Sequence, residues 1–249
     1  MSDPQTGRHM MNLPIPLGAI ERIEIVRGPA ARTYGVNALA GAVNIVTKKP
    51  VQDEVFAQAY AGSSLKQDTA NGETYFGWGA QASAAIAANK HSHILSAAYD
   101  KGSGFRYNTA YEAYRLFYQN HIVLNERNNI EAMGGYINND FGANAYYAAP
   151  SDKESKEGVE TAVGSIRYNY QPNSKLTISP RVSYRYNNDD YIFVQQNPAL
   201  YRNIHETNVV TGEIQSSYTL RKGTLGAGVE CRSEHINSTN LGKRDRNNL

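Results

Sequence analysis

The spacing of the links between segments of strand length constrains this chain more than any other feature. From about residue 54 onward, short links alternate with long ones along the sequence. The short links are residues 87–91, 125–128, 171–174 and 221–223, and the long ones are 63–73, 101–112, 139–160 and 187–205. An antiparallel meander with tight turns at one end and large loops at the other has this layout, which is typical of an outer-membrane β-barrel.

Alternating side chains in the later segments predict a sheet with one apolar and one polar face. Between Leu176 and Tyr186, apolar residues at even positions alternate with Thr, Ser and Arg at odd positions. Because charged side chains need water, we expect the polar face to line a wet interior and the apolar face to contact lipid. The residues expected to face lipid are Val182, Ile214 and Val229, and those expected to face the lumen are Arg181, Gln215 and Glu230.

Composition fits this class of protein. The mean hydropathy is −0.55, and the sequence has no apolar run long enough for a transmembrane helix, which a barrel does not need because only alternate residues face lipid. Tyr is abundant, with 18 residues against 6 Phe and 1 Trp, which suits the aromatic girdles of a barrel. A net charge of +2 gives no reason to expect nucleic acid as a partner, and the single Cys231 excludes a disulfide framework.

A soluble antiparallel β protein is the main structural alternative, since it would also alternate. It would not need all its short turns at one end and its long loops at the other. Nor would it need tyrosine pairs at strand ends, such as Tyr168 with Tyr170 and Tyr184 with Tyr186. We therefore predict an all-β fold, an antiparallel transmembrane β-barrel, for residues 51–249.

Residues 1–50 do not follow the meander. Residues 17–22 predict a short helical turn, and residues 23–26 and 41–47 predict two strands. Pro29 favours the first turn of a short helix through residues 30–32. The region is predicted to be a small α/β unit, too short to bury a good core alone.

The motifs of this region follow a recognisable order: I-E-R-I-E-I, R-G-P, Y-G and G-A-V-N-I-V-T, all between residues 20 and 47. They resemble the last part of the plug domain of TonB-dependent outer-membrane receptors, in which the plug precedes a barrel of 22 strands. The resemblance implies that residues 1–50 are the C-terminal part of a plug and that residues 51–249 supply about nine barrel strands. The residues implied to carry the plug structure and its coupling are Arg27, Gly28, Pro29, Tyr34, Gly35, Gly41 and Asn44.

The two ends of the chain predict a piece of a longer protein. Residues 2–5 have no basic or apolar signal-peptide region, and residues 242–249 are polar and are not expected to form an apolar closing strand. About nine strands cannot enclose a plug, and two open sheet edges are not tolerated in lipid. We therefore expect a TonB box upstream and further strands downstream.

The resemblance implies transport across the outer membrane of a Gram-negative cell, not catalysis. The expected partners are TonB, which would supply energy, outer-membrane lipid, an extracellular cargo and a surface lipoprotein. No arrangement of Ser, His, Asp or Cys in the sequence suggests an enzyme nucleophile. A surface adhesin on the same scaffold remains an alternative function, which TonB-dependent uptake would distinguish.

Two short matches favour cobalamin as the cargo. Residues 2–9 with 13–15, and residues 141–147, resemble segments of cobalamin-receptor-like members of the family. Phe141, Tyr146 and Tyr147 are candidate ligand contacts, because aromatic rings offer much contact area at little entropic cost. A ferric siderophore or haem remains an alternative cargo, and the tyrosines could also be ordinary aromatics at a loop tip.

No cofactor is expected, apart from a weak calcium candidate in the same loop. Asp140, Asp152 and Glu154 carry the oxygen ligands that Ca²⁺ prefers. Lysines are interleaved with these acids, so a solvated charged loop is the favoured interpretation.

Overall fold

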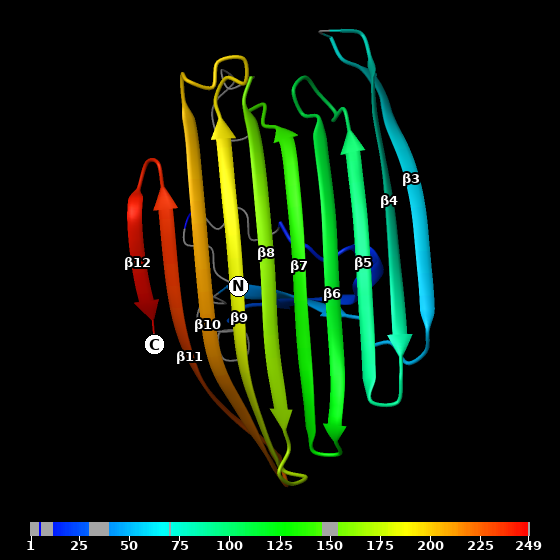
Figure 1. The fold of residues 1–249 in the computed structure, drawn as a ribbon, viewed down its shortest axis with the longest axis vertical. Helices are drawn as coiled ribbons and strands as arrows, with labels where there is room; N and C mark the ends of the chain where they lie inside the picture. The colour runs from blue at the N-terminus through cyan, green and yellow to red at the C-terminus, as the bar shows by residue number, and fades with distance from the viewer. Residues whose placement is uncertain (1–4, 6–11, 30–39, 70, 146–153, 249) are drawn as a thin grey trace.

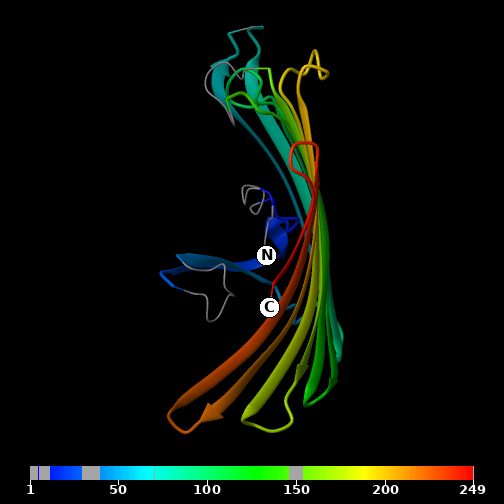
Figure 2. The ribbon, with the colours of Figure 1, turned by 90° about the vertical axis from the view of Figure 1, so that its left-hand side faces the viewer.

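The computed structural model describes residues 5, 12–29, 40–69, 71–145 and 154–248. These residues form a two-stranded sheet and a ten-stranded sheet, both antiparallel. The larger sheet is a tall, curved wall, and the smaller sheet projects from the concave side of that wall (Figures 1 and 2). No helix among the described residues is long and apolar enough to cross a membrane.

The smaller sheet contains the two strands that the sequence predicts near the N-terminus. A 3-10 turn, η2 (Leu17–Ala19), leads into β1 (Ile20–Arg27), which pairs with β2 (Gly41–Thr47). The expected helix through residues 30–32 lies outside the described residues. The described part of residues 1–50 contains no α-helix, so the predicted α/β character of this unit is not borne out there.

The larger sheet is an up-and-down meander in which each strand pairs with its neighbours in the sequence. Its strands are β3 (Glu54–Gln67), β4 (Thr74–Ala87), β5 (His91–Gly102), β6 (Tyr111–Asn125), β7 (Asn128–Gly142), β8 (Lys156–Tyr170), β9 (Leu176–Ile192), β10 (Arg202–Leu220), β11 (Gly223–Ser238) and β12 (Gly242–Asn248). β3 and β12 lie at opposite edges, so the sheet is open (Figure 1).

The predicted alternation of links is confirmed. Short turns join the strands at the lower end of Figure 1, and longer links join them at the upper end. The short turns are residues 88–90, 126–127, 171–175 and 221–222, and the longer links are 68–73, 103–110, 143–155 and 193–201. The link after β11, residues 239–241, is a short turn at the upper end.

The last strand adds to what the sequence predicts. The segment from residue 242 onward has no apolar closing strand, as expected, yet its polar residues form β12, which pairs with β11 along its length. Arg246 Nε donates to buried Glu234 at 2.7 Å, and Asp245 lies 2.7 Å from His235 Nδ1. Backbone pairing and these ionic contacts stabilise β12. Because the strand contains no apolar residue, hydrophobic alternation in the sequence does not predict it.

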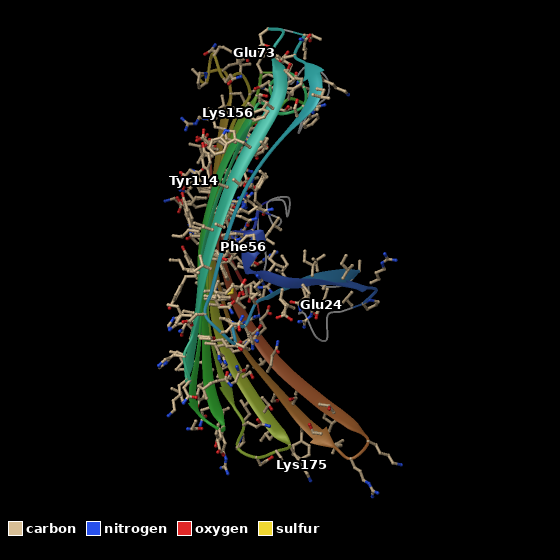
Figure 3. The ribbon with its side chains drawn as sticks, turned by 90° about the vertical axis from the view of Figure 1, so that its right-hand side faces the viewer. Glu24, Phe56, Glu73, Tyr114, Lys156 and Lys175 are labelled. Atoms are coloured by element: carbon tan, nitrogen blue, oxygen red, sulfur yellow. The ribbon has the colours of Figure 1, made fainter. Side chains whose placement is uncertain are left out.

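The two faces of the wall divide as the alternation predicts. Val182, Ile214 and Val229 are 61%, 49% and 57% exposed, and the register places Ile214 directly opposite Val229. The other face carries Arg181 and Glu213, which form an ion pair at 2.9 Å. Side chains project from both sides of the wall in Figure 3. The apolar set lies on the convex side, away from the projecting hairpin, because its positions alternate with those that face the hairpin.

Candidate functional site

The chain on either side of the β1–β2 hairpin is anchored to the concave face of the wall. Ala19, Ile94 and Phe117 form a buried cluster in which Ala19 and Phe117 are 0% exposed. The two ends of the hairpin meet at this cluster, because the Lys48 backbone N–H donates to the Ala19 carbonyl at 2.9 Å. A tight apolar contact therefore fixes the base of the hairpin against β5 and β6.

Polar side chains of the wall extend this anchor across several strands. Gln81 on β4 accepts from the Gly18 backbone N–H at 3.2 Å. Gln119 on β6 accepts from the Thr47 hydroxyl and donates to the Lys48 carbonyl at 3.2 Å. On β8, Thr161 accepts from Asn12 Nδ2 at 3.2 Å. Each bond uses a side chain of the polar face, so the wall recognises mainly backbone and small polar groups of the anchored segment.

An ion pair completes the anchor where the chain leaves the hairpin. Lys49 Nζ lies 2.8 Å from Glu131 Oε1 on β7, and Arg167 Nη1 on β8 lies 3.7 Å from the other oxygen of the same carboxylate. One carboxylate of the wall thus joins the hairpin segment to a cation of the neighbouring strand. Lys49 and Arg167 together therefore balance the charge on Glu131.

The hairpin itself depends on two glycines and one polar pair. Gly28 has φ +89°, and its backbone N–H donates to the Ala40 carbonyl at 3.1 Å. Gly41 has φ +153°, and a Cβ added there would lie 2.5 Å from the Val26 carbonyl oxygen. Both positions therefore require glycine, one for its backbone conformation and one also for lack of space.

Asn44 and Glu24 face each other across this hairpin. Asn44 Nδ2 donates to Glu24 Oε2 at 2.8 Å, and Arg22 Nε donates to Glu24 Oε1 at 2.8 Å. The bond from Asn44, followed by that from Arg22, lowers the pKa of the Glu24 carboxyl. Among the other predicted plug residues, Arg27 ends β1 and Pro29 follows Gly28, whereas Tyr34 and Gly35 lie outside the described residues.

Three of the longer links are braced to one another at the upper end of the wall. Asn108 Nδ2 donates to the Ser155 carbonyl at 2.7 Å, and Asn144 Nδ2 donates to the Tyr107 carbonyl at 2.6 Å. Glu154 accepts from the Tyr107 hydroxyl at 2.7 Å and from Gln196 Nε2 at 3.1 Å. Links that are far apart in the sequence therefore form one structured cluster rather than separate tails.

A cavity of about 530 Å³ opens in this loop cluster. Its lining residues are Lys66, Gln67, Thr69, Tyr75, Phe105, Arg106, Tyr107 and Asn144. A second hollow of about 330 Å³ begins at the same ring of Tyr75 and continues over Tyr60, Trp78 and Tyr111. Both hollows combine aromatic rings with polar groups.

The larger cavity has the chemistry to hold an aromatic or anionic ligand. Arg106 lies with its guanidinium carbon 5.4 Å from the centre of the Phe105 ring, and its Nη2 donates to the Asn144 carbonyl at 2.5 Å. The hydrogen bond to Glu154 raises the pKa of the Tyr107 hydroxyl, so this group remains a neutral donor. Lys66, near the end of β3, adds a second cation.

The structure brings together only part of the predicted ligand set. Phe141 lies at the end of β7, opposite Tyr111 and Glu157 on the concave face, whereas Tyr146 and Tyr147 lie outside the described residues. The sequence reasoning missed Phe105 and Arg106. Their signal was available, because a basic residue beside aromatic ones occurs in a predicted long link.

The calcium candidates have separate partners. Asp140 pairs with Lys156 at 3.4 Å, Glu154 accepts from Tyr107, and Asp152 lies outside the described residues. In the described ranges, no group of three or more His, Cys, Asp or Glu side chains is placed to hold a metal ion. Asp140 and Glu154 therefore each have a protein partner, and the charged-loop interpretation stays a prediction.

No protein-family model matches this chain. Comparison with known proteins finds transporters and receptors that resemble a short part of it. Over 60 residues it is 37% identical to the vitamin B12 transporter BtuB of Vibrio vulnificus, a match that covers 24% of this chain and 10% of that protein. Over 60 residues it is 43% identical to the probable TonB-dependent siderophore receptor PirA of Acinetobacter baumannii, covering 24% and 8%.

Solved structures show the same fold. The ferric citrate transporter FecA in its unliganded form superposes with a TM-score of 0.71 at 17% identity, covering 90% of this chain and 36% of that one. The siderophore receptor PirA from Pseudomonas aeruginosa gives 0.70 at 17% identity, covering 94% and 39%. The chain therefore spans less than half the length of these proteins.

Proposed function

We propose that this chain, which belongs to the family of TonB-dependent outer-membrane receptors, forms part of a receptor that imports a large metal chelate across the outer membrane. The observation that supports this best is a hairpin whose flanks are anchored by polar contacts to the concave face of a wall, with apolar side chains on the convex face. Members of this family are transporters and receptors rather than enzymes.

We assign residues 1–50 to the C-terminal part of a plug and residues 51–249 to the first strands of a barrel of 22. The long links would then face the cell exterior and the short turns the periplasm. TonB would act on a plug segment upstream of this chain, and import would require the plug to change its arrangement against the wall. A surface lipoprotein partner remains part of this proposal for the loop end.

An anionic metal chelate is the cargo that the loop cavity fits best. Lys66 and Arg106 supply positive charge, Phe105 and Tyr107 supply rings, and Asn144 supplies an amide. A ferric siderophore or haem presents acidic groups beside flat surfaces, which match these side chains. Cobalamin is the second candidate, because a vitamin B12 transporter is among the relatives and two segments of the sequence resemble that group.

A ligand panel tests the proposal on the complete receptor. Binding of cyanocobalamin, haem and several ferric siderophores would be measured for the wild type and for an Arg106→Gln variant. We expect one metal chelate to bind and the variant to weaken it about tenfold, a typical loss for one charged hydrogen bond. Lys222→Gln, in a turn at the other end of the wall, is the matched control.

Uptake separates import from simple surface attachment. The bound ligand should enter cells that contain TonB and remain outside cells that lack it. Binding without any TonB-dependent uptake would favour the adhesin alternative. If only cobalamin binds, and Arg106→Gln leaves its affinity unchanged, cobalamin would replace the anionic chelate as the proposed cargo.

A further inference from the structure

The four short turns at the lower end of the wall carry an excess of positive charge. Their basic residues are Lys90, Arg127, Lys175, Arg221 and Lys222, here called the turn cations. All five are exposed, and none forms an ion pair with another residue that the structure describes. Figure 3 shows Lys175 at this end of the molecule, far from the loop cluster.

Few carboxylates share the lower end with the turn cations. Glu126 lies beside Arg127, and Asp53 lies at the start of β3, where it accepts the Ala87 backbone N–H at 2.9 Å. Glu54 lies 3.8 Å from Lys48, so that its charge is already balanced. The turns therefore keep a net positive charge that the chain does not neutralise.

The convex face near the longer links behaves differently. Three cations project there from the upper ends of strands, and each has a carboxylate partner. The pairs are Lys101 with Glu112 at 3.0 Å, Lys156 with Asp140 at 3.4 Å, and Arg202 with Asp190 at 2.5 Å. On the convex face, three upper cations thus have carboxylate partners and Lys243 on β12 has none among the described residues, whereas all five turn cations lack one.

Aromatic side chains of the convex face lie directly above the turn cations. His93 stacks on Tyr118 with ring centroids 6.1 Å apart, and Tyr168 stacks on Tyr170 at 6.4 Å. Tyr218, opposite Leu225, lies on the convex face near the end of β10, and the turn with Arg221 follows it. Tyrosines are enriched where a membrane protein crosses the boundary between hydrocarbon and headgroups. Cations just beyond such a belt lie at the depth of lipid phosphates.

We infer that the turn cations bind the headgroups of anionic phospholipids, of which phosphatidylglycerol is the probe. Neighbouring turns are separated by two strands, so successive cations lie about 10 Å apart along the edge of the sheet. A long, shallow row of this kind fits a lipid surface better than one compact protein. The inference rests on the proposed function only for its orientation, with the short turns in the phospholipid leaflet.

The test compares two triple variants of the complete receptor in symmetric vesicles of phosphatidylcholine. One variant is Lys90→Gln, Arg127→Gln, Lys175→Gln, and the matched control is Lys101→Gln, Lys156→Gln, Arg202→Gln. Association of spin-labelled phosphatidylglycerol relative to spin-labelled phosphatidylcholine would be measured by electron paramagnetic resonance. Because each Lys or Arg near an anionic lipid surface contributes about fivefold to association, we expect the loss of three such cations to reduce the preference by at least about fivefold.

Several outcomes decide the question. The control should keep the wild-type preference for phosphatidylglycerol, and added salt should weaken that preference in the wild type and the control. An equal loss in both variants, or no preference in the wild type, would overturn the inference and leave an acidic protein as the better partner for the turns. Both leaflets of a symmetric vesicle have the same lipids, so the result does not depend on the direction in which the receptor is inserted. A receptor that fails the uptake test could therefore still prefer phosphatidylglycerol, and the two proposals can fail separately.

Discussion

The projecting hairpin and the wall that holds it differ in how their stability is supplied. The base of the hairpin is buried against Phe117 and Ile94, and its flanks bond to side chains on β4, β6, β7 and β8. The hairpin strands are open by comparison, with Ile23, Ile25 and Val43 54%, 69% and 55% exposed (Figure 2). The base is thus fixed by tertiary contacts, whereas the strands depend mainly on each other. Local opening should therefore begin in the hairpin strands rather than at the base.

The largest expected effect comes from emptying the base. Phe117→Ala removes a fully buried ring, and such changes typically cost about 3–5 kcal/mol. The matched control, Ile25→Ala on the open hairpin, should cost no more than about 0.5 kcal/mol. Chemical unfolding of the complete receptor in detergent would measure both. Equal losses in the free energy of unfolding would show that the hairpin strands are packed as firmly as the base. That result would contradict the proposed difference between the two regions.

The wall offers a second contrast, between its two faces. Val229→Arg should cost about 2–4 kcal/mol if this position lies near the middle of the bilayer, because the charge would enter hydrocarbon. Gln215→Arg on the polar face should cost much less, since water and carboxylates such as Glu213 are available there. Unfolding in lipid vesicles would compare the two variants. A similar cost on both faces would contradict the assignment of the convex face to lipid.

The glycine at the start of β2 tests the hairpin alone. Gly41→Ala would place a methyl group against the Val26 carbonyl in a backbone conformation that alanine rarely adopts, at a cost of about 1–3 kcal/mol. The loss should appear as faster hydrogen exchange of the β1 and β2 amides, with the wall unchanged. Gly212→Ala, where the added group would meet no neighbouring atom, is the control. Faster exchange in the wall strands would mean that hairpin and wall unfold together.

Much of this architecture could be predicted from spacing, and the exceptions have physical causes. Link lengths and period-2 alternation gave the meander, its faces and strands β1 and β2, because these patterns are local. β12 was missed because its stability comes from pairing and from the bond between Arg246 and Glu234, not from apolar residues.

The sites were harder to predict than the sheet. Contacts such as Lys49 with Glu131 join residues distant in the sequence, and a single sequence does not specify their partners. The loop cavity depends on how separate links meet, and although Phe105 and Arg106 stand together in the sequence, the residues that they meet lie in other segments. The motif residues Gly28, Gly41 and Asn44 are positioned in one hairpin, and their proposed part in coupling stays a prediction.

The smallest expected effect is a dependence of the hairpin on pH. Glu24 has an ordinary pKa of 4.5, and the bonds from Asn44 and Arg22 lower it in the folded hairpin. A lowered folded pKa means that the carboxylate stabilises the hairpin fully above about pH 4.5, and that this contribution is lost as the pH falls through the folded pKa. Glu24 projects with the hairpin into open space (Figure 3), so solvent screens the interaction and the change should be slight.

Hydrogen exchange of the β1 and β2 amides in wild type and Asn44→Ala would measure this dependence. Protection should fall on acidification in the wild type and change less in the variant, which lacks the main cause of the lowered pKa. The amides of β8 and β9 serve as an internal reference, since they lie in the centre of the wall. A fall in protection that is the same in both proteins would assign the acid sensitivity to other carboxylates, such as Glu131 at the anchored base. The base would then respond to pH before the hairpin, the reverse of the order inferred from their contacts.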